Sequence, residues 1–137
     1  MFSKAQIVLF LIGLSIGSIS NGSGFERKGI LCFEMGAEVA YYFIKGKVIR
    51  YSAFHAFVPP TELQKQLYGS YEVSGDKIRW VDRRTKVRFS YDRKKMTLAA
   101  NEKWSTASTC DEVTISEIKE YFRPILERNR TNQKSPY

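Results

Sequence analysis

The chain has 137 residues, of which 22 are basic and 14 acidic, giving a net charge of +8, and it is 43% hydrophobic and 14% aromatic. The hydrophobic content excludes a disordered chain, and the length left after removal of an export signal, about 115 residues, predicts one domain. The positive charge suits an anionic partner without naming one.

Residues 1–20 have the pattern of a secretory signal. A positively charged start precedes an apolar run over residues 7–16, and small and polar residues follow. The run is short for a membrane span, and the small residues Ser18 and Ser20 predict cleavage at about 20–22. We therefore expect an exported protein, periplasmic or secreted. The alternative is a membrane anchor formed by an uncleaved signal.

The two cysteines, Cys32 and Cys110, predict one disulfide. An oxidising compartment would form and keep this bond, and only one intramolecular pairing exists. The spacing fits neither a CxxC redox motif nor a zinc site. In the chain-entropy description, closing a loop of this length stabilises a domain by roughly 4–5 kcal/mol.

Residues 25–127 are predicted to form a single β-rich domain. Its first strand covers residues 30–35, and residues 39–44 and 48–54 form a hairpin through the turn Lys45-Gly46. Because both faces of these strands are apolar, we expect them to lie centrally.

The segment after Pro59-Pro60 is less regular. Residues 61–67 suggest a short helical turn with Leu63 and Leu67 on one face.

Strict alternation of apolar and polar residues over residues 71–98 predicts a four-stranded meander with one apolar face. Three polar turns, at 74–77, 82–85 and 92–95, separate its strands. The registers that keep the apolar set on one side pair Val73 with Ile78, Trp80 with Val87 and Tyr91 with Met96.

A C-terminal helix follows Cys110. Thr114 and Glu117 have capping-box spacing. An apolar stripe comprises Ile115, Ile118, Phe122 and Leu126. Pro124 is expected to end or kink the helix near Phe122, and residues 128–137 are expected to form a polar tail. Asn129 begins a glycosylation sequon, which matters only in a eukaryotic host.

These elements together predict a mainly β fold. We expect a curled antiparallel meander or half-barrel of about seven strands with one C-terminal helix. The alternative is a two-layer α+β sheet.

The outward face of the meander is strongly basic. Between Asp76 and Lys95 the chain has nine basic and three acidic residues, and the predicted registers place Arg79 opposite both Glu72 and Arg88. Like charges directly across strands are destabilising, and an anion between the arginines would offset this. The candidate anion-binding residues are Arg79, Arg88, Lys77, Lys86, Arg83 and Arg84. The alternative is a solvated face whose cations discourage edge-to-edge aggregation.

The partner suggested by this face is an anionic lipid headgroup or a phosphate polymer. We do not expect sequence-specific nucleic acid, because base stacking needs aromatic rings on the basic face. The aromatic residues of the meander are instead assigned to the opposite, core face: Tyr71, Trp80, Phe89 and Tyr91.

His55 is the only histidine, and it lies among apolar residues. Residues at such positions usually belong to the core or its rim. The sequence has no nucleophile elbow, phosphate-binding loop, dinucleotide fingerprint or metal-binding motif, so we assign no catalytic residue, cofactor or metal. We expect a non-catalytic binding or accessory protein. The alternative is a small secreted hydrolase that uses His55.

The chain resembles small uncharacterised exported proteins of marine bacteria and their phages. The shared features are a signal sequence, an early strand cysteine, an aromatic meander with Asp-Arg-Lys before a leucine strand, a second cysteine and a charged C-terminal helix. They correspond here to Cys32, Tyr71, Trp80, Asp92-Arg93-Lys94, Leu98 and Cys110. The resemblance covers most of the mature chain, supports the architecture and implies no activity.

Overall fold

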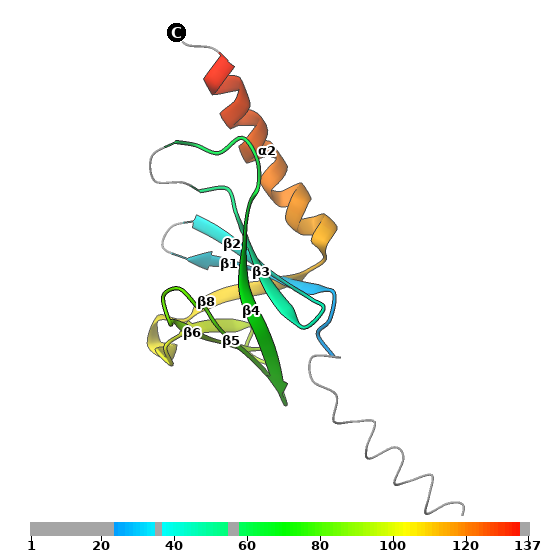
Figure 1. The fold of residues 1–137 in the computed structure, drawn as a ribbon, viewed down its shortest axis with the longest axis vertical. Coiled ribbons are helices and arrows are strands. Elements are labelled where there is room, and N and C mark those ends of the chain that lie inside the picture. The colour runs from blue at the N-terminus through cyan, green and yellow to red at the C-terminus, as the bar shows by residue number, and fades with distance from the viewer. Residues whose placement is uncertain (1–23, 35–36, 55–57, 135–137) are drawn as a thin grey trace, which may run out of the picture.

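Eight antiparallel strands form a closed barrel in which each strand pairs with the next and β8 returns to β1 (Figure 1). The computed structural model describes residues 24–34, 37–54 and 58–134, so the predicted signal and His55 lie outside the described residues. The strands are β1 (Lys28–Glu34), β2 (Ala37–Ile44), β3 (Lys47–Ser52), β4 (Gln64–Ser74), β5 (Lys77–Val81), β6 (Arg88–Asp92), β7 (Thr97–Ala100) and β8 (Ser108–Val113). A short 3-10 helix, η1 (Trp104–Thr106), precedes β8, and helix α2 (Ile115–Lys134) follows it.

The predicted fold class, an antiparallel meander with one C-terminal helix, is therefore confirmed. The additional strand is β8, which carries Cys110 and pairs with both β7 and β1. Its sequence, Ser-Thr-Cys-Asp-Glu-Val, lacks the apolar alternation that marks the other strands. This strand closes the sheet, and the prediction consequently stopped at a half-barrel.

Aromatic side chains fill the interior of the barrel. Tyr41, Phe43 and Tyr91 are fully buried, and Trp80 stacks on Phe89 with ring centroids 5.5 Å apart. An eight-stranded barrel has an interior just wide enough for such side chains. The assignment of the meander aromatics to the core is thus correct.

The disulfide between Cys32 and Cys110 is confirmed. The two cysteines face each other directly in the β1–β8 ladder, with Cα atoms 4.2 Å apart. Because β1 and β8 form the seam at which the barrel closes, this bond joins the first strand to the last.

Helix α2 covers the outside of strands β1 to β3. Its residues Ile118 and Phe122 are buried in a second apolar cluster, which includes Ala40 and Tyr42 of β2. Strand β2 is consequently covered on both faces, by the barrel interior and by the helix, which explains why it is apolar throughout.

The helix begins as predicted and ends later. The Thr114 Oγ1 accepts from the Glu117 N–H, and the Glu117 carboxylate accepts from the Thr114 N–H, each at 3.1 Å. The helix then continues through Pro124 to Lys134, so the tail expected from Arg128 onward is largely helical.

Side-chain bonds to the segment before β4 hold this last part of the helix. Asn129 Nδ2 donates to the Pro60 carbonyl at 2.8 Å, and Gln133 Nε2 donates to the Pro59 carbonyl at 2.9 Å. Arg130 Nε donates to the Thr61 carbonyl at 3.1 Å. These contacts stabilise the helix beyond the position at which proline removes one of its backbone bonds.

The helical turn predicted over residues 61–67 is wrong. Strand β4 begins at Gln64 and pairs with β3 as far as Ser52. The ladder supplies backbone hydrogen bonds that one isolated helical turn lacks. Leu63 packs beside α2, and Leu67 is exposed.

The meander registers are correct for β4–β5 and shifted by two residues in the next two hairpins. Tyr71 pairs with Trp80, as predicted, but Trp80 pairs with Phe89 and Tyr91 pairs with Leu98. Both turns are longer than assumed, because the residues Lys86 and Met96 adopt left-handed conformations before their strands begin. A shift of two preserves the buried face, which is why the apolar pattern could not reveal it.

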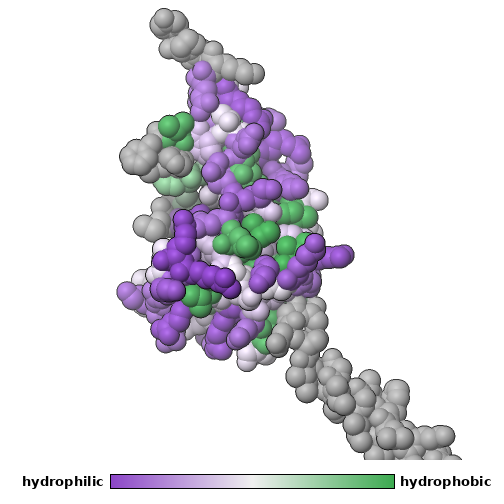
Figure 2. All heavy atoms as spheres, in the orientation of Figure 1, coloured by the Kyte–Doolittle hydropathy of each residue, from purple (hydrophilic) through white to green (hydrophobic). Residues whose placement is uncertain are grey.

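The surface is mostly hydrophilic. In Figure 2, polar side chains cover most of the visible barrel and helix, and apolar ones form small separate patches. Within the described residues, no helix is both long and apolar enough to span a membrane.

Candidate functional site: an outer cleft on strands β4 to β6

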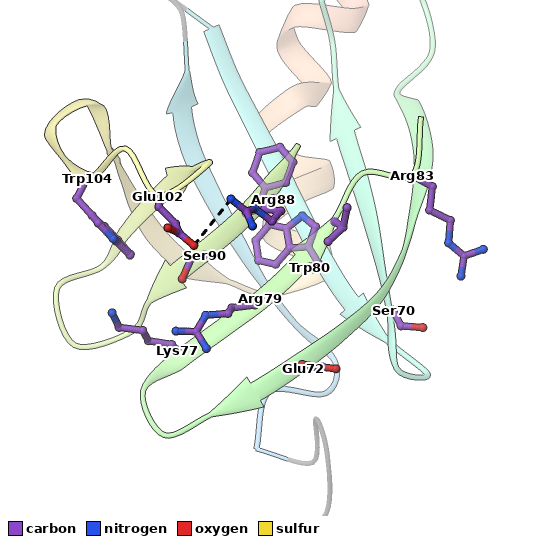
Figure 3. A pocket seen from close by; sticks show the side chains of 12 residues that line it. Ser70, Glu72, Lys77, Arg79, Trp80, Arg83, Arg88, Ser90, Glu102 and Trp104 are labelled. Atoms are coloured by element: carbon purple, nitrogen blue, oxygen red, sulfur yellow. Dashed lines mark ion pairs between the residues drawn. The ribbon is translucent and has the colours of Figure 1, made fainter. Parts of the chain in front are cut away.

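The outer faces of β4, β5 and β6 form a cleft of about 710 Å³, which we call the outer cleft. Four cationic residues line it: Lys77, Arg79, Arg83 and Arg88. Its other polar or aromatic residues include Glu72, Ser90, Glu102 and Trp104. Figure 3 shows Trp104 and Arg83 at opposite ends of the cleft, with Arg79 and Ser90 between them.

Strand alternation explains this composition. Trp80 and Phe89 point into the barrel, so Arg79, Arg88 and Ser90 lie on the outward side of the same strands. The pattern that buries the aromatic core therefore also gathers the cations on one outer face.

Arg79 pairs with Ser90 in the β5–β6 ladder, and Arg88 pairs with Val81. The predicted direct pairing of Arg79 with Arg88 is therefore wrong, because the turn between β5 and β6 is two residues longer than assumed. The two arginines are diagonal neighbours on one face, a spacing of about 7–8 Å that long side chains can bridge.

Most of the cationic charge in the outer cleft has no acidic partner. Arg79 lies opposite Glu72, as predicted, yet no ion pair joins them, and none of the ion pairs formed by the described residues includes Lys77 or Arg83. Arg88 reaches Glu102 at 4.0 Å, and both side chains are largely exposed. Such a pair contributes little and is easily exchanged for another anion.

Ser90 provides an unsatisfied hydroxyl at the floor of the cleft. The residue is 8% exposed, and its Oγ has no hydrogen-bond partner among the described residues. Buried polar groups are nearly always hydrogen-bonded, so the unpaired Ser90 hydroxyl marks a candidate binding position.

Trp104 forms the aromatic wall of the cleft. The Lys77 Nζ lies 4.9 Å from the centre of the indole ring, and Trp104 is 38% exposed. Trp104 was not among the predicted site residues, because alternation puts every aromatic residue of the meander on the core face and Trp104 lies outside the meander. A tryptophan in the polar stretch before Cys110 was the signal available for it.

Two of the six predicted anion-binding residues lie outside the cleft. Lys86 is exposed at the end of the β5–β6 turn, and Arg84 lines a different cleft. Arg93 of the next turn has a structural role: its guanidinium binds Glu112 at 3.1 Å and lies over the Phe25 ring.

No group of histidine, cysteine or acidic residues suited to a metal ion occurs in the part of the chain that the structure describes. No protein-family model matches the chain, and comparisons with curated proteins and with solved structures also give no match.

Proposed function

We propose that this is an exported, non-catalytic binding protein that holds a phosphate-type anionic group of an envelope component in the outer cleft. The observation that carries the proposal is the arrangement around Ser90: this residue, whose buried hydroxyl is unsatisfied, lies opposite Arg79 and two positions after Arg88 on the same face of β6. Two guanidinium groups and a hydroxyl donor are the usual means of binding a tetrahedral oxyanion.

Two features independent of the cleft support the proposal that the protein is exported. The apolar run at the start of the chain is typical of a signal, and a disulfide persists in oxidising compartments. Intact-mass measurement on the protein recovered from cells expressing the full chain tests it. A mature protein beginning near Asn21 to Ser23 is expected, and an intact N-terminus in the membrane fraction would indicate the anchored alternative.

The binding test compares two variants with the same charge change. Arg79→Gln with Arg88→Gln removes two cations from the cleft, and Lys94→Gln with Lys95→Gln removes two exposed cations from the β6–β7 turn. The probes are pyrophosphate, long-chain polyphosphate and phosphatidylcholine vesicles with and without phosphatidylglycerol. Each is titrated at low and at physiological ionic strength.

We expect the wild type and the Lys94/Lys95 variant to bind at least one phosphate probe, and the Arg79/Arg88 variant to lose that binding. Affinity should fall as salt rises, because bound counterions are released. Equal affinity of the two variants would show that only overall charge matters. Absence of binding by the wild type would reject the proposal.

A further inference from the structure

A second cleft lies on the other side of the β5–β6 turn, at one end of the barrel, and we call it the rim cleft. Its volume is about 380 Å³. Three cations and three neutral polar residues line it: Arg50, Lys65, Arg84, Ser52, Gln64 and Gln66. The described residues place no carboxylate in its lining, whereas two line the outer cleft.

The two clefts share two walls. Strand β4 contributes Ser70 to the outer cleft and Gln66 to the rim cleft. The β5–β6 turn contributes Arg83 to the outer cleft and Arg84 to the rim cleft, and consecutive Cα atoms lie about 3.8 Å apart. A ligand that leaves the outer cleft at Arg83 therefore meets Arg84 next.

The turn between the clefts is held firmly. The carboxylate of Asp82, a residue that is 5% exposed, accepts from the Arg84 N–H at 3.0 Å and from the Thr85 hydroxyl at 2.9 Å. Arg83 lies against β4, where its Nε would be 3.3 Å from a Cβ atom added to Gly69. These bonds fix the backbone of the turn before a ligand arrives, which lowers the entropic cost of placing both arginines beside it.

The cations of the rim cleft are available to a ligand. Among the described residues, no hydrogen-bond acceptor or ion-pair partner contacts the Arg84 or Lys65 side chain. Arg50 donates to Ser52 Oγ at 3.5 Å, and its charge also acts on the nearby Glu34. Glu34 therefore offsets part of the positive charge of the rim cleft, and the net charge of the three cations and Glu34 remains positive.

The two clefts face different directions. Arg50 and Ser52 alternate along β3 with Ile49 and Tyr51, which lie under helix α2 on the outside of the barrel. The pairing of β3 with β4 puts Gln64 and Gln66 on the same inward side as Arg50 and Ser52, whereas Lys65, which pairs with Tyr51, lies on the outward side. The rim cleft therefore reaches the inward side of the sheet at the barrel end, while the outer cleft belongs to the outward side only. A flexible chain can bend around the turn into both clefts, whereas a flat layer of lipid headgroups can enter only one.

We infer that the ligand is a linear polymer with phosphate-type anionic groups, which occupies the outer cleft, passes over Arg83 and Arg84 and continues into the rim cleft. This inference rests on the proposed function of the outer cleft and adds the class of ligand. It assigns Arg50, Lys65 and Arg84 to a second subsite. A single phosphate group held between Arg79 and Arg88 would leave the rim cleft unused.

The experiment uses the mature, disulfide-bonded protein and the variant Lys65→Gln with Arg84→Gln. Pyrophosphate and long-chain polyphosphate are titrated. The polymer concentration is expressed as the concentration of positions along the chain (binding registers) at which one protein molecule can bind, so that polymer length alone gives no advantage. We expect the wild type to bind the long chain about a hundredfold more tightly than pyrophosphate, because the second subsite acts at high effective concentration. The Lys65/Arg84 variant should lose this advantage and keep its affinity for pyrophosphate.

The salt dependence provides a second readout. For long-chain polyphosphate, the slope of log affinity against log salt should become shallower by roughly 0.7 for each rim-cleft cation that no longer binds a phosphate group. The Lys94→Gln with Lys95→Gln variant should keep both the slope and the chain-length advantage. It is the control for the loss of two positive charges, because neither lysine lines either cleft.

The failure of this inference differs from failure of the proposed function. Two results would overturn the inference that a polymer spans both clefts, while anion binding in the outer cleft would still stand. One is equal affinity per register for pyrophosphate and the long chain. The other is an unchanged chain-length advantage in the Lys65/Arg84 variant. Tighter binding to anionic vesicles than to polyphosphate would also overturn it, in favour of a lipid headgroup. Absence of wild-type binding to every probe would reject both proposals.

Discussion

Gly29 and Ile118 meet where helix α2 crosses strand β1, and a Cβ atom on Gly29 would lie 2.8 Å from Cδ1 of Ile118. It would also lie 3.2 Å from the Tyr41 carbonyl oxygen and 3.3 Å from that of Val113. Side-chain ends can move, but these carbonyls belong to the β-ladders on both sides of β1. The absence of a side chain at position 29 therefore allows the helix to lie close to the barrel wall.

Gly29→Ala should lower the free energy of unfolding by roughly 1–3 kcal/mol, the usual cost of overpacking. Ile118→Val removes the nearest atom, so the double variant should be more stable than the sum of the single effects predicts. Urea unfolding of the four proteins measures this coupling. Gly24→Ala is the control, because its Cβ would meet no atom within 4 Å. A Gly29→Ala protein as stable as the wild type would contradict the prediction.

The disulfide should be required for a stable barrel. The β1–β8 ladder contains four residue pairs and the adjoining β7–β8 ladder two, so few backbone hydrogen bonds hold the last strand. Cys32→Ala with Cys110→Ala should lower the free energy of unfolding by about 4 kcal/mol, because the bridged residues lie 78 positions apart. That is a large part of the stability of a domain of this size.

Denaturant unfolding with and without a reducing agent tests this prediction. Reductant should destabilise the wild type and leave the Ala/Ala variant unchanged, which separates loss of the bond from other effects of reduction. If the wild type unfolds at the same denaturant concentration in both conditions, the bond is dispensable.

The elements with a regular apolar pattern were predictable from sequence. The hairpin of β2 and β3, the meander and the capped start of α2 follow from alternation and from the Thr114–Glu117 spacing. The residues in β8 and at the start of β4 were not, because backbone pairing with distant strands, rather than their side-chain pattern, makes them strands. The continuation of α2 past Pro124 likewise depends on bonds to residues about 70 positions away.

The candidate site was predictable in charge and not in geometry. Alternation placed Arg79 and Arg88 on the outer face, and both line the outer cleft. Their pairing depended on the length of the β5–β6 turn, which the left-handed Lys86 extends. Trp104 begins the short helix η1, which packing brings beside Lys77, and no local periodicity encodes such a contact.

Asn129 should stabilise the end of α2 through its bond to the Pro60 carbonyl. Asn129→Ala should lower the free energy of unfolding by about 1 kcal/mol relative to Asn132→Ala, because only the first removes a hydrogen bond. Asn132 is an exposed position in the same helix, and its substitution reports the gain in helix propensity alone. Chemical unfolding of both variants measures the difference, and equal stabilities would show that the bond contributes nothing.

Glu34 should make the stability of the barrel depend on pH. Burial raises the pKa of its carboxyl above the usual value, and the hydrogen bond from Tyr41, 3.1 Å long, and the charge of Arg50 oppose this only in part. As pH rises from acid, the unfolded state therefore ionises before the folded state does. The stabilising contribution of protonated Glu34 is complete below the unfolded pKa and is lost as pH rises through the folded pKa.

Glu34→Gln keeps the size of the side chain and an acceptor for Tyr41 but does not titrate. The stability of the variant relative to the wild type should therefore rise with pH above about 4.3, the ordinary pKa of glutamate, and become constant above the folded pKa. Urea unfolding from pH 3 to pH 8 measures this difference, and the height of the plateau gives the shift at about 1.4 kcal/mol per pKa unit. Glu127→Gln, at an exposed position of α2, is the control for loss of one charge. A difference between Glu34→Gln and wild type that stays constant over the whole pH range would mean that Glu34 has the same pKa in both states.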